Sequence, residues 1–286
     1  MRATPDALNN RNATSGPGGA DSVLAAAAGF WLLTALIGQW LFFYYIANFY
    51  GPAMATGNYE GWAVLSAMGA KGYLEGDTAG NMTFGAHALA AGIIAFGGAL
   101  QLIPQIRAKA PAFHRWNGRL FLLTVVGLSL TGFWLVWGRG SPPDSLVEMA
   151  TTLNGVLILV FAGLAGRHAM ARRIAIHRRW AMRLYLVSNA QWFMRIGVFA
   201  WFVGNMALGN KVSMTDPFMS IWPFGCYLVP LAVLELYLRA RHRGGPIARG
   251  AVAALLVALT LLMGLGIFAF FMFSQKILSG APLSLG

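Results

Sequence analysis

A few polar side chains interrupt the long apolar stretches of this 286-residue chain, and they are the first candidates for chemistry. His87 can donate, accept or carry a proton near neutral pH, whereas Arg195 carries a fixed positive charge. An ionisable side chain within a membrane span is costly and usually faces the bundle interior, so it indicates a functional site. The same stretches hold four uncharged polar residues of interest, namely Gln39, Thr131, Asn154 and Gln191.

Their positions along the sequence place these side chains at a comparable depth. At about 1.5 Å of rise per residue, the histidine, the arginine, Asn154 and Gln39 lie roughly 6–12 Å below the external ends of their spans. The other two fall near the same layer, so we predict a polar pocket in the outer half of the bundle. A small anionic molecule, a quinone-like molecule or a proton would suit it. In a purely structural alternative, His87 would hydrogen-bond Asn154 and fix the helix register.

In the predicted pocket each side chain has a separate task. Arg195 would supply the fixed charge, and His87 would supply a titratable donor or acceptor. The amide side chains of Asn154 and Gln39 would orient the bound molecule.

A second group of ionisable residues is expected at the cytoplasmic ends of the spans. Positive charge there can contact anionic lipid headgroups, form an anion site, or place arginines beside the propionates of a histidine-ligated haem. Two histidine ligands of one haem must share one depth, which excludes His87, roughly 20 Å of bilayer away. A haem b at the inner edge is therefore the remaining cofactor candidate. The group consists of His114, Arg115, Arg119, His168, His177, Arg178 and Arg183.

Other kinds of site have little support in the sequence. Cys226 is the only cysteine, which excludes an intrachain disulfide, a CxxC redox pair and a thiolate metal cluster. We find no nucleotide-binding loop, zinc motif or supported catalytic triad, so no metal site is predicted and catalysis stays an open question. The alternatives to a ligand-binding protein are a membrane electron carrier linked to haem or quinone, and a structural or assembly subunit.

The elements that must position these residues are membrane helices. The chain is 57% hydrophobic and 10% charged, whereas soluble domains average about 25% charged residues, so most of its surface faces lipid. A helix needs about 20 apolar residues to cross the hydrocarbon core, and continuous apolar runs indicate helices instead of a barrel. We predict an all-α bundle of seven transmembrane helices, at residues 23–47, 83–103, 119–137, 148–165, 180–202, 218–238 and 249–273.

The segments outside the spans follow from these boundaries. Residues 1–22 are polar and are expected to form a disordered cytoplasmic tail before the transmembrane domain of residues 23–274. The longest external loop is 50–82, in which residues 59–74 are expected to form a short helix on the outer surface. Residues 275–286 would form an external tail.

The distribution of basic residues predicts the orientation. Arginines are concentrated in the loops after the second, fourth and sixth spans, whereas the opposite loops hold few basic residues. The positive-inside rule makes these loops and the N-terminus cytoplasmic and the C-terminus external, as in a multi-pass protein of the bacterial inner membrane. The net charge of +12 therefore indicates contact with anionic lipids and not with nucleic acid. Glu235, near the inner end of its span, is expected to pair with a nearby arginine.

A weak internal repeat relates two helix hairpins. Residues 114–120 (HRWNGRL) open the third span, and residues 177–184 (HRRWAMRL) open the fifth, with Trp, Arg and Leu aligned. Each segment follows a helix that descends to the cytoplasm. Spans two and three therefore resemble a duplicate of spans four and five.

The same residues resemble a family of bacterial membrane proteins called domain of unknown function 2306. Its members combine a membrane histidine, an HRxxGR loop, a later HRxWMxR loop and a membrane arginine. In this chain, His87, residues 114–119, residues 177–183 and Arg195 stand at those places. The resemblance covers residues 83–202. It implies a helical membrane protein and no particular activity.

Overall fold

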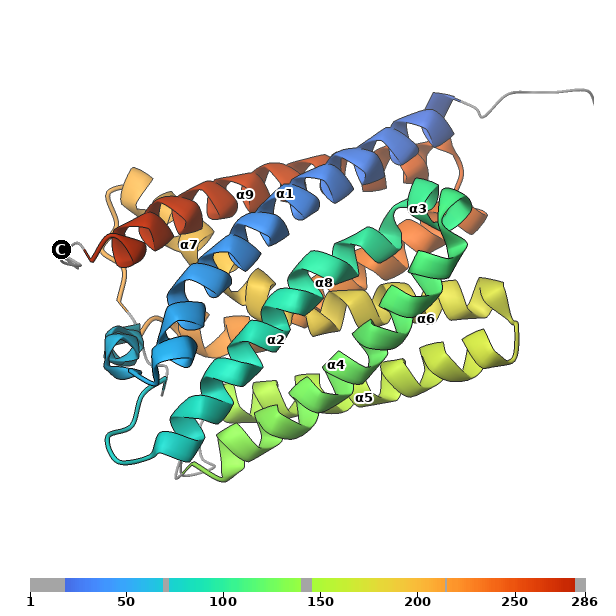
Figure 1. Cartoon of the computed structure of the whole chain (residues 1–286). Coiled ribbons are helices and arrows are strands. Elements are labelled where there is room, and N and C mark those ends of the chain that lie inside the picture. The colour runs from blue at the N-terminus through green and yellow to red at the C-terminus, as the bar shows by residue number, and fades with distance from the viewer. Residues whose placement is uncertain (1–18, 69–71, 140–145, 214, 281–286) are drawn as a thin grey trace, which may run out of the picture.

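The structure, a computed structural model, describes residues 19–68, 72–139, 146–213 and 215–280, and every regular element in these ranges is a helix (Figure 1). Six of the helices are long and apolar enough to cross a membrane. They are α1 (Gly19–Thr56), α2 (Thr78–Leu102), α4 (Pro111–Trp137), α5 (Leu146–Met170), α8 (Pro217–Arg243) and α9 (Pro246–Leu278). The predicted all-α polytopic membrane fold is therefore confirmed.

Four shorter helices complete the described part of the chain: η2 (Glu60–Met68), α3 (Pro104–Lys109), α6 (Ile174–Ser188) and α7 (Ala190–Ala207). Prolines begin several elements, because the first turn of a helix does not need the N–H that proline lacks. Pro104 opens α3, Pro111 opens α4 and Pro246 opens α9. The predicted end of the second span before Pro104 is confirmed, since α2 ends at Leu102.

The first and last helices extend beyond their predicted spans. α1 begins at Gly19, so residues 19–22 are helical and do not belong to the expected disordered tail; residues 1–18 lie outside the described residues. Asp21, in the first turn of α1, pairs with Arg249 of α9 at 2.9 Å. α9 continues to Leu278, into the segment expected to be an external tail. The ion pair fixes the beginnings of α1 and α9 beside each other, and the two helices run in parallel (Figure 1).

The predicted fifth span, 180–202, is divided into two helices that meet at Asn189. In a continuous helix the N–H of Asn189 would bond the carbonyl of Tyr185. Here the Asn189 side chain takes that carbonyl at 2.8 Å, and the N–H bonds the carbonyl of Leu186 at 3.3 Å. An asparagine side chain that competes for backbone hydrogen bonds explains the break. Neither α6 nor α7 is among the six candidate spans.

Together, α6 and α7 pack along the whole of α8. Arg183 of α6 pairs with Glu235 in the second half of α8, and Trp201 of α7 stacks on Phe218 in its first turn. The pair therefore runs antiparallel to a candidate span and covers a similar length. A seventh crossing formed by α6 and α7 requires this arrangement, and the count of seven and the orientation stay predictions.

The segment between α1 and α2 packs into the bundle. A short helix, η2, forms where a surface helix was expected. Trp62 and Leu65 of η2 are buried, and Trp62 contacts Tyr50 of α1 and Phe84 of α2. The expectation of a helix lying on the outer surface was wrong for this face of η2, because its aromatic contacts make it part of the core.

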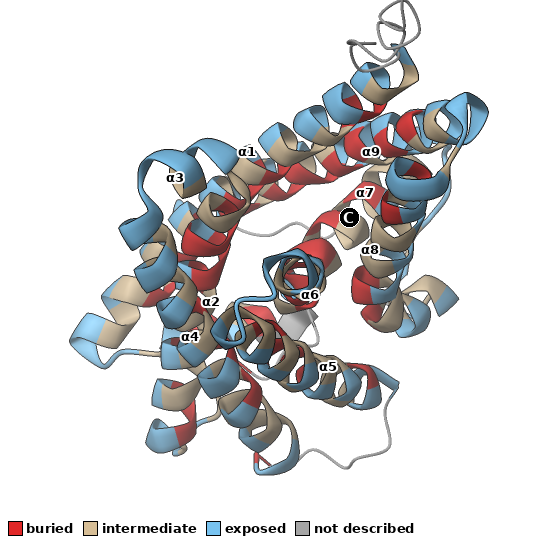
Figure 2. Cartoon of the chain, turned by 90° about the vertical axis from the view of Figure 1, so that its right-hand side faces the viewer, coloured by how far each residue is buried: buried red, intermediate tan, exposed pale blue. Residues whose placement is uncertain are grey.

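The buried residues lie on the faces that the helices turn toward each other, as the end-on view in Figure 2 shows. The outward faces carry large apolar side chains such as Leu123 and Phe268, which are 73% and 63% exposed. Such exposure suits contact with lipid tails and would be unfavourable in water. The interior is thus divided among several helix interfaces, and the polar residues singled out above are distributed among them.

Candidate functional site

α2 and α4 lie antiparallel, and their register positions His87. Near one end of the pair, the Asn117 side chain of α4 donates to the carbonyl of Gly97 on α2 at 2.9 Å. Toward the other end, the Nδ1 atom of His87 lies 2.8 Å from the hydroxyl oxygen of Thr131. The structure thus brings together two residues of the predicted polar layer, one from each helix.

The Thr131 hydroxyl orients the imidazole. Its oxygen lies 2.8 Å from the carbonyl of Gly127, to which the hydroxyl can only donate. The imidazole Nδ1 atom, the Thr131 hydroxyl and the Gly127 carbonyl are all satisfied when Nδ1–H donates to Thr131. This assigns the proton of the neutral ring to Nδ1. The Nε2 atom of His87 has no hydrogen bond within the described residues. It is left as an acceptor, or as a donor once the ring is protonated.

His87 lines a groove of about 370 Å³ between α2 and α4. Small residues, including Ala86, Ala90 and Gly127, form much of its wall, and Thr83 and Thr124 add hydroxyls to it. Ala86 and Gly127 are exposed, so the groove opens on the outer surface of the bundle. Its volume is in the range of sites for small molecules, about 300–1,000 Å³.

Arg195 lies at a different interface, between α7 and α1. Its Nη1 atom donates to the carbonyl of Gln191 at 2.9 Å, and the Gln191 side-chain oxygen is 3.4 Å away. The guanidinium carbon lies 5.2 Å from the centre of the Phe42 ring on α1, within cation–π range. None of the ion pairs among the described residues includes Arg195. Its charge therefore faces amide and aromatic groups.

The two other residues of the predicted layer are also apart from His87. Gln39 of α1 is fully buried, and its Oε1 atom accepts a hydrogen bond from the Tyr185 hydroxyl of α6 at 2.9 Å. Asn154 of α5 has a buried Oδ1 atom that lacks a hydrogen-bond partner in the described structure. No described hydrogen bond, ion pair or ring contact joins His87 to Arg195, Gln39 or Asn154. The layer consists of at least two groups, at the α2–α4 and α1–α7 interfaces.

The histidines of the second group lie at the other end of the α2–α4 pair. His114 and His177 both occupy the first turn of their helices, α4 and α6, and they interact electrostatically. The Nδ1 atoms of His114 and His168 are buried without a described partner, whereas Nδ1 of His177 lies 2.9 Å from the carbonyl of Ala165. Because His87 is level with Thr131, 17 residues from His114 on α4, the two histidines are about 25 Å apart along the helices, too far for one haem.

The internal repeat is visible in the side-chain geometry. Arg119 lies over the ring of Trp116, and Arg183 lies over the ring of Trp180, each at 4.8 Å. Arg183 also bonds Glu235, with the Nη2 atom 2.7 Å from the carboxylate, which confirms the predicted arginine partner of Glu235. The remaining arginines of the group, Arg115, Arg119 and Arg178, are exposed.

Sequence reasoning missed a polar cluster where α2 begins. Arg139, just after α4, is 8% exposed; its Nε atom lies 2.8 Å from the Asp77 carboxylate and its Nη2 atom 2.5 Å from the Asn81 side-chain oxygen. The Gly80 N–H and then the Arg139 guanidinium hold the pKa of Asp77 below its usual range. The available signal was an aspartate at a helix N-cap. The partner arginine, 62 residues away, is a tertiary contact.

These features define an all-helical polytopic membrane protein with polar groups buried between its apolar helices. A family model described as "Predicted membrane protein (DUF2306)" matches residues 84–238, more than half of the chain, and the protein belongs to this family. The match extends beyond the resemblance at residues 83–202 and includes most of α8. No curated protein and no solved structure matches the chain.

Proposed function

We propose that this protein binds a quinone-like, lipid-soluble molecule in the α2–α4 groove beside His87. The observation that carries the proposal is an imidazole, held by Thr131, that lines a groove of about 370 Å³ on the outer surface of the bundle. We place the protein in the bacterial inner membrane, with its arginine-rich loops against anionic lipids on the cytoplasmic side. The groove then lies in the outer half of the bilayer.

The groove suits a flat ring that carries oxygen atoms. Ala86, Ala90 and Gly127 leave the helix backbones accessible, so a planar ring can pack closely between them. The neutral His87 ring accepts a hydrogen bond at Nε2 from the hydroxyl of a quinol, and the protonated ring donates to the carbonyl of a quinone. The groove opens where the bundle meets lipid, so a lipid-soluble molecule can enter it from the bilayer.

An anionic ligand fits this groove less well than a quinone-like one. An anion in a low-dielectric site needs a fixed cation or several donors. The cation expected for the pocket, Arg195, lies against Phe42 on α1, and no described contact connects it to His87. A neutral ring with polar edges needs only the hydrogen bonds that the groove supplies.

The test is photolabelling of the purified full-length protein with an azido-substituted short-chain benzoquinone, followed by mass spectrometry of the labelled peptides. We expect label in the α2 and α4 segments that line the groove, and competition by unlabelled decylubiquinone. Gly127→Leu should fill the groove and reduce labelling there at least tenfold. No atom lies within 4 Å of a Cβ built on Gly127, so the backbone at this position has space for a side chain.

Two matched controls separate blocking from general damage. Gly163→Leu makes the same change on α5, also with no atom within 4 Å, and should leave labelling unchanged. His87→Gln should weaken binding roughly tenfold, the effect of about 1.4 kcal/mol for a lost hydrogen bond, whereas His168→Gln should not. Label spread evenly over the lipid-facing helices, and equal in both glycine variants, would reject the proposal and favour a structural role for His87.

A further inference from the structure

Two hydrogen-bond donors are buried without partners near the break between α6 and α7. The Nε2 atom of Gln39 and the Nε1 atom of Trp192 have no hydrogen bond among the described residues, and the two residues are 0% and 2% exposed. In the interior of a membrane protein no bulk water replaces a missing partner, so buried donors are expected to be satisfied. An indole N–H and an amide NH₂ can only donate. The missing partner must therefore be an acceptor.

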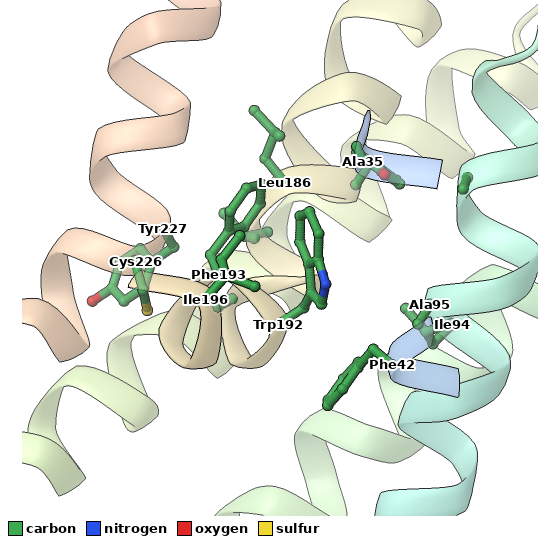
Figure 3. Packing of buried hydrophobic residues seen from close by; sticks show 14 of the residues in the cluster. Ala35, Phe42, Ile94, Ala95, Leu186, Trp192, Phe193, Ile196, Cys226 and Tyr227 are labelled. Atoms are coloured by element: carbon green, nitrogen blue, oxygen red, sulfur yellow. The ribbon is translucent and has the colours of Figure 1, made fainter. Parts of the chain in front are cut away.

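Both donors lie at the same interface. Gln39 precedes Phe42 by three residues, so the two side chains share one side of α1. The Trp192 ring packs on α1 beside Gln39, since a Cβ built on Gly38 would lie 2.8 Å from its Cζ2 atom. Figure 3 shows the indole nitrogen of Trp192 turned away from α7, toward the space between Phe42 and Ala95 of α2. Gln39 and Trp192 thus adjoin each other where α1 meets α7.

A positive charge without a described carboxylate partner lies next to these donors. Arg195 follows Trp192 by one turn of α7, and its guanidinium lies over the Phe42 ring at 5.2 Å. Arg195 is half-buried, and its hydrogen bond to the Gln191 carbonyl is exposed. A cation within a membrane span is normally balanced by an opposite charge. The described ion pairs do not provide one for Arg195.

The two donors lie beside the break between α6 and α7. α7 is an 18-residue helix that begins at Ala190, two residues before Trp192. The N–H groups of Trp192 and Phe193 bond the Asn189 carbonyl, and α6 ends at Ser188, so the negative end of α6 offsets the positive end of α7. The preference for negative charge therefore comes from the two donors and the arginine.

We propose that a small monovalent anion of the size of chloride binds between α1 and α7. It accepts hydrogen bonds from Gln39 Nε2 and Trp192 Nε1, and Arg195 balances its charge. One arginine balances one negative charge, whereas sulfate or phosphate would bring more charge and need more donors. This site is separate from the α2–α4 groove, and its existence does not depend on quinone binding.

The test measures the thermal unfolding midpoint of the purified full-length protein while chloride is replaced by gluconate at constant ionic strength. In the wild type we expect chloride to raise the midpoint by roughly 3 °C between millimolar and 300 mM concentrations, because a ligand of the folded state stabilises it. Trp192→Phe keeps an aromatic ring and removes only the N–H, and it should abolish the shift. Trp201→Phe makes the same change elsewhere on α7, where the ring stacks on Phe218, and should keep the shift.

A second variant and a second measurement decide the matter if Trp192→Phe does not fold. Gln39→Glu places a carboxylate where the anion would bind, so its unfolding midpoint should not respond to chloride. The chloride-35 resonance should broaden in the presence of wild-type protein and sharpen again when bromide is added. Equal wild-type midpoints in chloride and gluconate, or a full chloride shift in Trp192→Phe, would overturn the proposal. The first outcome would leave water as the acceptor.

Discussion

Gly266 of α9 packs directly against the backbone of α7, and replacing it tests how closely the two helices approach. A Cβ atom built on Gly266 would overlap the carbonyl oxygen of Ile196 and lie 2.9 Å from the carbonyl carbon. Carbon atoms in ordinary contact are about 3.5–4.0 Å apart. Gly266→Ala must therefore push the helices apart by roughly 0.5–1 Å, since a backbone carbonyl cannot rotate away as a side chain can.

The expected cost follows from this separation. A gap of about 0.5–1 Å forfeits a quarter to a half of the dispersion attraction for each contact across the interface, and overpacked cores lose about 1–3 kcal/mol. Because the clash is with backbone, we expect Gly266→Ala to lower the free energy of unfolding by about 3 kcal/mol. Gly264, on the same helix, has no atom within 4 Å of its Cβ position. Gly264→Ala should raise the free energy of unfolding by about 0.5–1 kcal/mol through helix propensity.

The assay is reversible unfolding of the purified protein in mixed micelles, with helical circular dichroism followed against the fraction of denaturing detergent. The two variants add the same methyl group two residues apart, so their difference reports packing alone. Equal unfolding midpoints for Gly266→Ala and Gly264→Ala would show that α7 and α9 do not approach as closely as described here.

Three further predictions concern the charged groups and the orientation. The Gly80 N–H and the Arg139 guanidinium lower the pKa of Asp77. The contribution of Asp77 to stability is therefore complete above its unfolded pKa of about 4 and is lost as the pH falls through the lowered pKa of the folded state. Asp77→Asn should therefore flatten the pH dependence of the melting temperature below about pH 4, and an unchanged profile would contradict the ion pair. A double-mutant cycle between Arg183 and Glu235, both partly exposed, should give a coupling of about 1 kcal/mol in unfolding experiments; additive single effects would argue against the pair. If α6 and α7 cross the membrane, an impermeant maleimide should label Lys211→Cys in intact cells and Ala171→Cys only after permeabilisation. The background labelling should be low because the native cysteine is buried. Labelling of both variants in intact cells would exclude the crossing.

Several particular features were predictable because they depend on local sequence. Pro104 and Gly138 mark helix ends for steric and conformational reasons that act within a few residues, and α2 and α4 end beside them. The internal repeat could be read from its aligned Trp and Arg residues, and each pair forms the same cation–π contact because the spacing of three residues is local. The partner of Glu235 was predictable as a type of residue, since a membrane-edge carboxylate needs a cation.

The break at Asn189 lay beyond the same reasoning. Asparagine occurs within continuous helices, and its side chain ends α6 here by taking the carbonyl of Tyr185. No proline or glycine marks the position. The apolar composition of residues 180–202 predicted one span, because hydropathy measures transfer into lipid and is insensitive to a single competing hydrogen bond.

The sequence by itself predicted a depth for each polar residue, because helical rise converts residue number into distance along a span. It therefore grouped His87 with Arg195 in one layer. Which neighbours a residue meets depends on how each helix is rotated and on which helix packs beside it, and these are decided by side-chain packing over the whole bundle. Only the tertiary structure placed His87 against Thr131 on α4 and Arg195 against Phe42 on α1. One predicted layer thus became two interfaces with different chemistry.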